Sequence, residues 1–133
     1  MTNIELVQGL YAAFGRGDLE AIIAGLTADV DWQDYGRPSD FPSFGPRRGH
    51  DEVRDFFAVL TRDVDFLAFE PRQFHAAGDM VFVLGRSVMA MNRNGRQVDT
   101  DWVHVFRVSG GKVSSFREFA DTAQIAEAWK AAA

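Results

Sequence analysis

The chain has 133 residues, a length that fits one domain with a sizeable core. Its 14 basic and 19 acidic residues are mixed along the sequence and give a net charge of −5, so no basic stripe indicates a nucleic acid or an anionic membrane as partner. The absence of cysteine excludes disulfides, a thiolate nucleophile and a zinc–thiolate site. No segment approaches the length of a membrane span, and no secretory signal pattern opens the chain, so we expect a cytoplasmic protein.

The first third of the chain is predicted to be helical. Thr2 and Glu5 form the pattern of a capping box, and apolar residues then recur at helical spacing as far as Phe14. Asp18 is expected to cap a second, short helix. The alternation of apolar and polar residues over 30–35 predicts a short strand after it.

A long irregular loop is expected next, because residues 36–49 contain three prolines and three glycines. Loops of this length in a compact domain are often functional. We expect the side chains of Phe41 and Phe44 to fold the tip of this loop over a cavity. A third helix is predicted to begin near Asp51.

The remaining sequence is mostly β. Alternation predicts four strands, at residues 65–76, 79–91, 97–108 and 112–120. The connections between them are short turn sequences, so the strands form an antiparallel meander. A last short helix begins near Asp121 or Thr122. This order of elements predicts one α+β domain over residues 1–133.

Three ionisable side chains interrupt the apolar faces of the predicted strands: Asp34, His104 and Glu118. The large neighbours that share a face with them under period two are Trp32, Trp102 and Phe116. Charges among such residues are paired, neutralised or used. The pattern therefore predicts a polar site inside an apolar pocket. A purely structural pattern is the alternative, with a buried His–Glu pair fixing strand register and Asp34 capping the following loop.

Two further observations concern the later strands. Arg86 follows the same alternation as Leu84 and as Phe82, which we place in the core, so it is a candidate partner for Glu118 or for a substrate anion. A solvated strand end explains its position equally well. The opposite faces of these strands are also apolar, and that outer set comprises Val81, Val83, Met89, Val103 and Val105. A sheet that is apolar on both sides must cover its second face.

Metal and cofactor sites are not predicted. The three histidines, His50, His75 and His104, lack the short ligand spacing of zinc sites. No glycine-rich phosphate loop or nucleophile elbow is present. Any chemistry is therefore expected to need no cofactor.

Five segments, in this order, resemble the nuclear transport factor two-like superfamily, which includes SnoaL-like polyketide cyclases and steroid Δ-isomerases. They are YAAFGRGDLEAI (11–22), ADVDWQD (28–34), GHDEVRDFF (49–57), HVFRVSGGKV (104–113) and FREFADT (116–122). The resemblance covers essentially the whole chain. It implies a conical (cystatin-like) α+β barrel, in which a curved antiparallel sheet wraps around three N-terminal helices and leaves an apolar pocket.

The resemblance also implies roles for single residues. Asp34 occupies the position of the aspartate that acts as general base in the steroid isomerases. His104 stands where those enzymes have a second, protonated aspartate, and Leu10 stands where they have the oxyanion tyrosine, with Tyr11 next to it. Members of the superfamily commonly pair through the outer sheet face, which implies a homodimer.

The resulting hypothesis is a cofactor-independent isomerase or lyase that acts on a small hydrophobic carbonyl compound. Asp34 would abstract a proton, and His104 and Glu118 would stabilise or relay charge. The predicted pocket wall comprises Tyr11, Trp32, Phe41, Phe44, Phe57, Trp102 and Phe116. Two alternatives remain open: a non-catalytic binding protein for a small apolar ligand, and a dehydratase or hydrolase that acts through a water held by Asp34 and His104.

Overall fold

The computed structural model describes residues 1–133 and contains four helices and one six-stranded sheet. The helices are α1 (Asn3–Gly15), α2 (Leu19–Ala24), α3 (Gly49–Asp63) and α4 (Thr122–Lys130). The strands are β1 (Leu26–Asp34), β2 (Gly45–Arg48), β3 (Val64–Ala77), β4 (Met80–Met91), β5 (Gln97–Ser109) and β6 (Lys112–Ala120). No helix is both long enough and apolar enough to span a membrane.

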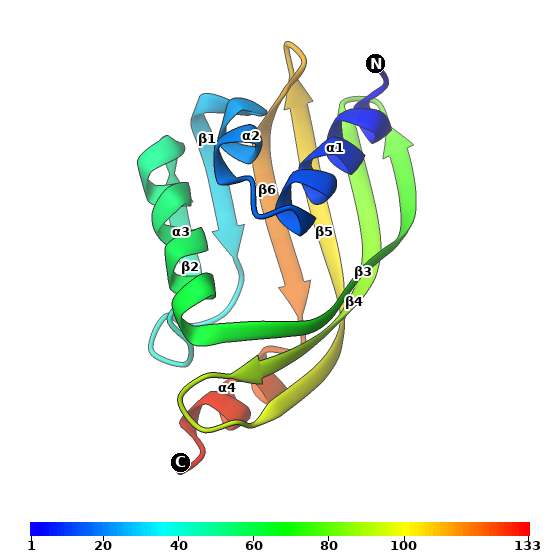
Figure 1. Ribbon diagram of the computed structural model, residues 1–133. Coiled ribbons are helices and arrows are strands. Elements are labelled where there is room, and N and C mark those ends of the chain that lie inside the picture. Colours follow the sequence, from blue (N-terminus) through cyan, green and yellow to red (C-terminus); the bar gives the residue numbers. More distant parts are fainter.

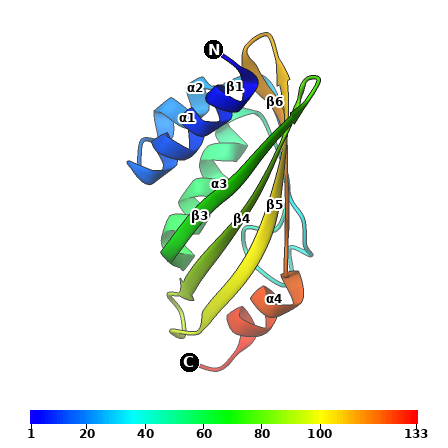
Figure 2. The same ribbon diagram turned by 90° about the vertical axis from the view of Figure 1, so that its right-hand side faces the viewer.

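The sheet is curved and open, with strand order β2-β1-β6-β5-β4-β3. The three N-terminal helices lie against its concave face, and α4 lies at the end where β6 stops (Figures 1 and 2). This arrangement confirms the predicted α+β barrel-like fold. Strands β3 to β6 form the expected antiparallel meander.

The first part of the sheet differs from the prediction in two ways. Strand β1 pairs with β6 in parallel, so the sheet is mixed and not wholly antiparallel. The predicted irregular loop also contains a short strand, β2, which pairs with the end of β1 at the sheet edge. Pro46 is compatible with β2 because an edge strand can leave one position without a donor.

The helix starts follow from local side-chain bonds. Thr2 and Glu5 form the predicted capping box of α1, and the Asp18 carboxylate accepts a hydrogen bond from the Ala21 backbone N–H at the start of α2. Asp121 caps α4 in the same way, through the Gln124 N–H. These bonds satisfy helix N–H groups that have no partner within the helix.

The two faces of β4 are assigned opposite to the prediction. Val81, Val83 and Met89 are buried on the concave face, whereas Leu84 is 40% exposed on the outer face. Arg86 therefore also points outward, where it pairs with Asp99 and not with Glu118. Both faces of this strand are apolar, so alternation separates the two sets without showing which one meets the core.

Candidate functional site

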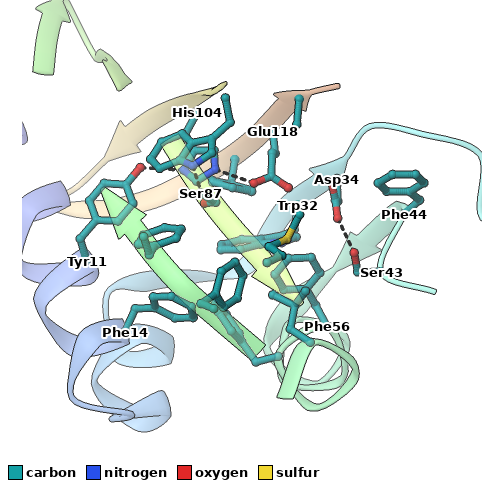
Figure 3. Close-up of a pocket in the computed structure, with 18 of the residues that line it drawn as sticks. Tyr11, Phe14, Trp32, Asp34, Ser43, Phe44, Phe56, Ser87, His104 and Glu118 are labelled. Carbon is teal, nitrogen blue, oxygen red and sulfur yellow. Dashed lines mark hydrogen bonds and ion pairs between the residues drawn. The ribbon is translucent and has the colours of Figure 1, made fainter. Parts of the chain in front are cut away.

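The polar side chains of the site form one row across the concave face of the sheet. Asp34 on β1 is the direct neighbour of Glu118 on β6, and Glu118 is in turn the direct neighbour of His104 on β5. Neighbouring residues on paired strands point to the same face, so their side chains lie together (Figure 3). The structure thus brings together the three ionisable residues singled out in the sequence.

A chain of hydrogen bonds extends this row at both ends. The Tyr11 hydroxyl lies 2.7 Å from Nδ1 of His104, and Nε2 of the same ring lies 2.7 Å from Oε1 of Glu118 (Figure 3). At the other end, Oγ of Ser43 donates to Oδ2 of Asp34 over 2.7 Å. Helix α1 and the loop before β2 are therefore both tied to the sheet through the polar row.

His104 is neutral in this environment. Burial lowers its pKa to about 3, against the opposing effect of the Asp34 charge. A neutral imidazole has one N–H, and we assign it to Nε2 because the partner there is the carboxyl of Glu118. Nδ1 then accepts a hydrogen bond from Tyr11. Burial, followed by the charge of Glu118, raises the pKa of Tyr11, so its hydroxyl keeps the proton that it donates.

The two carboxyl groups are both less acidic than usual. Burial is the largest cause that raises the pKa of Asp34, followed by the negative charge of Glu118 and a hydrogen bond to it. Burial also raises the pKa of Glu118, whereas the hydrogen bond to Asp34 lowers it. The pair therefore titrates as a unit that keeps a proton to higher pH than ordinary carboxyl groups do.

The row borders a cavity of about 100 Å³ that is mostly apolar. Its lining contains 24 residues, 18 of them hydrophobic, and includes no lysine or arginine. All seven residues of the predicted pocket wall lie in this lining: Tyr11, Trp32, Phe41, Phe44, Phe57, Trp102 and Phe116. Tyr11 thus points into the cavity. The sequence did not show this orientation, because Leu10, and not Tyr11, occupies the position of the oxyanion tyrosine.

Several lining residues were not identified from the sequence. Ser43 is 1% exposed and holds Asp34, yet it lies in a loop segment without any periodic pattern. Ser87 also borders the cavity and accepts a hydrogen bond from Nε1 of Trp102. Phe14 and Phe56 complete the wall opposite the polar row, and their helical spacing is the one signal that indicated an inward position (Figure 3).

The other histidines lie elsewhere. Nε2 of His50 is 3.0 Å from the carbonyl oxygen of Leu26, and His75 is exposed on β3. No group of three or more histidine, aspartate or glutamate side chains is arranged to hold a metal ion.

Comparison with known proteins places this chain in a family. The model of the SnoaL-like domain matches residues 7–116. The chain belongs to the SnoaL-like family. Among solved structures, an NTF2-like protein of unknown function from Burkholderia pseudomallei K96243 is 30% identical, with a TM-score of 0.90 over 98% of this chain and 100% of that chain. No curated protein matches the chain in sequence.

Two other solved structures show how widely this family's fold is shared. TerC, co-crystallised with polyporic acid, is 28% identical and has a TM-score of 0.86 over 97% of this chain and 98% of that chain. A Catenulispora acidiphila protein with a ketosteroid isomerase-like fold, in complex with trimethylamine, has a TM-score of 0.78 over 93% of this chain and 91% of that chain. Its identity is 14%, so the similarity concerns the fold alone.

Proposed function

We propose that the chain is a cofactor-independent isomerase or lyase that acts on a small hydrophobic carbonyl compound. The observation that carries this proposal is the pair of neighbouring carboxyl groups, Asp34 and Glu118, at an apolar cavity whose lining offers no cation. Two carboxyl groups in such a place share a proton, which leaves one as an acid and the other as a base. Moving a proton from carbon requires both roles.

The electrostatics favour Glu118 as the base and Asp34 as the acid. The pKa of Asp34 is raised by burial and also by the charge of Glu118 and the hydrogen bond to it, and its residue is 3% exposed. The Glu118 side chain is 24% exposed and borders the cavity, so its carboxylate is accessible to a ligand. The role of base, which the sequence assigned to Asp34, therefore passes in this proposal to its neighbour on β6.

The proton transfers are as follows. Glu118 takes a proton from the carbon next to the substrate carbonyl, while the Asp34 hydroxyl donates a hydrogen bond to the carbonyl oxygen and supports the developing enolate. Return of the proton from Glu118 to a different carbon completes an isomerisation. In a lyase, Asp34 instead gives its proton to a leaving hydroxyl, and water is released.

The size of the cavity supports a small substrate. A cavity of roughly 150 Å³ holds benzene in a well-studied apolar case, so a cavity of about 100 Å³ favours a small molecule. Steroids exceed this space. The related TerC was co-crystallised with polyporic acid, which supports an organic small molecule as the ligand here.

Deuterium exchange tests this proposal without knowledge of the natural substrate. Cyclohex-2-enone, incubated with the protein in D2O, should lose its acidic C–H signals in ¹H NMR faster than in buffer. Replacing Glu118 by Gln keeps size and polarity but removes the base, so the added rate should fall by about 10²-fold or more. Glu127→Gln, at an exposed position of α4, is the matched control and should leave the rate unchanged. Equal rates for wild type and Glu118→Gln would refute the proposal.

A non-catalytic binding protein is the second candidate. The observation that favours it is the closed hydrogen-bond chain, in which the donors of Tyr11, His104 and Ser43 already have acceptors within the site. A saturated network of this kind also suits a ligand held by apolar contacts alone. Saturable binding of cyclohex-2-enone, measured by calorimetry, without any exchange above buffer would support this candidate.

A further inference from the structure

The His104 ring is part of a stack of aromatic rings. The indole of Trp102 lies almost parallel to the imidazole, with ring centroids 3.9 Å apart and planes inclined by 17°. Phe69 stacks on Trp102 at 5.3 Å and 23°. A planar ring beside a planar ring restricts rotation of both, so the orientation of Trp102 sets the plane of the imidazole.

Two residues of β4 hold the indole in this orientation. Oγ of Ser87 accepts a hydrogen bond of 2.7 Å from Nε1 of Trp102, and both side chains are buried. Gly85 lies directly opposite Trp102 in the β4–β5 pairing. A Cβ atom at Gly85 would lie 2.3 Å from Cζ2 of the indole and 2.7 Å from the backbone carbonyl oxygen of Glu70, so the ring lies flat across β4 at a position where no side chain fits.

The plane of the imidazole matters because both of its nitrogens are in use. Nε2 faces Glu118 and Nδ1 faces Tyr11, each at 2.7 Å, and a hydrogen bond weakens steeply when its angle falls. The titratable groups that face this ring are Tyr11 from α1, Asp34 from β1 and Glu118 from β6. A tilted ring would lose its two in-plane contacts together.

We propose that Ser87 and Gly85 are positioning residues that act through Trp102, holding its indole flat on His104 and thereby fixing the imidazole as the Nε2–H tautomer that faces Glu118. Neither residue is placed in contact with the reacting carbon. Their effect on proton transfer rests on the proposed function, because only an ionised Glu118 that acts as base depends on the orientation of this imidazole. Their effect on the tautomer of His104 is independent of the proposed function.

The test is ¹⁵N NMR of the histidine side chains in wild type, Ser87→Ala, Ser87→Thr and Gly85→Ala. Wild type should show His104 as a single Nε2–H tautomer. Ser87→Ala removes the acceptor of the indole N–H and should produce a mixture of tautomers, with deuterium exchange of cyclohex-2-enone about tenfold slower, as expected for a misplaced catalytic group. Ser87→Thr keeps the hydroxyl and should keep the wild-type tautomer. Gly85→Ala should resemble Ser87→Ala.

A double-mutant cycle shows whether Ser87 acts through Trp102. Trp102→Phe retains a flat ring without the N–H, so Ser87→Ala should change the His104 spectrum in the wild-type background and have no further effect in the Trp102→Phe background. An unchanged His104 tautomer in a folded Ser87→Ala protein would overturn the proposal, even if its melting temperature were lower. If Ser87→Ala changes the tautomer of His104 while the wild-type protein shows no deuterium exchange above buffer, the proposed function is refuted and the positioning role stands.

Discussion

Two aspartates of one strand, Asp31 and Asp34, have opposite environments. Asp31 lies on the outer side of β1 and receives a hydrogen bond of 2.9 Å from Arg117, which holds the pKa of its carboxyl below the usual range. Asp34, three residues further on, lies in the cavity, and burial raises its pKa well above the usual value. The same residue type is thus a stronger acid than usual on one side of the sheet and a weaker acid than usual on the other.

The difference shows what the inner face of the sheet provides. On the outer face, carboxylates have arginine partners, as in the pairs Arg86–Asp99 and Arg107–Asp79. The cavity offers no arginine or lysine, so no cation offsets the cost of burying its two carboxyl groups, and keeping a proton lowers that cost. A pocket without a cation is therefore what makes acid–base chemistry available.

The largest effect of this contrast should appear in the pH dependence of stability. Folding raises the pKa of Asp34, so the protonated carboxyl contributes to the free energy of unfolding most fully below the unfolded pKa of about 3.9. This contribution is lost as the pH rises to the folded pKa, at about 1.4 kcal/mol per pH unit. Asp34→Asn should remove this loss, so the variant should gain stability relative to wild type as pH rises. Thermal unfolding between pH 4 and 9 measures it.

Asp31→Asn is the matched variant on the outer face. Folding lowers the pKa of Asp31, so the ionised carboxyl contributes to the free energy of unfolding above the unfolded pKa. This contribution is lost as the pH falls. This variant should therefore be less stable than wild type at neutral and alkaline pH, and the difference should disappear as the pH falls through the lowered pKa of Asp31. If the stability of both variants, relative to wild type, changed with pH in the same direction, the two aspartates would not have the opposite pKa shifts described above.

Substitutions on the outer face of the sheet should affect the activity of the site least. We propose that two copies pair through its apolar row, in which Leu84 on β4, Val103 on β5 and Phe119 on β6 are neighbours. Leu84→Glu should separate the dimer in light scattering at micromolar concentration, while deuterium exchange stays within about twofold of wild type, because the substitution is on the face opposite the cavity. Leu67→Glu, at an exposed position of β3, is the control. An unaltered protein that is a monomer would contradict the proposal.

Much of the fold could be predicted from local signals. Capping residues marked the starts of α1, α2 and α4, and alternation marked β3 to β6 to within about two residues. The parallel pairing of β1 with β6 could not be predicted in this way, because it joins residues more than 80 positions apart and depends on where the whole meander folds back. The short strand β2 was missed because it lies within residues 36–49, a segment with three prolines and three glycines.

The polar row could be predicted because it interrupts apolar alternation, and each of Asp34, His104 and Glu118 carries that signal in its own strand. The residues that hold the row carry no such signal. Ser43 lies in a loop, Ser87 is a small polar residue in a long strand, and Gly85 acts only through the space that it leaves. Their effects depend on contacts across strands, which a pattern along one strand does not contain.

The central claim is that Asp34 and Glu118 share a proton and that Asp34 holds it more strongly. A ¹³C NMR titration of the side-chain carboxyl groups tests this directly, with Asp31 as an internal reference. We predict two separate steps, in which Glu118 ionises first and Asp34 keeps its proton to higher pH, while Asp31 ionises below its usual range. The account would be contradicted if Asp34 and Glu118 both ionised together at about pH 4, as ordinary carboxyl groups do.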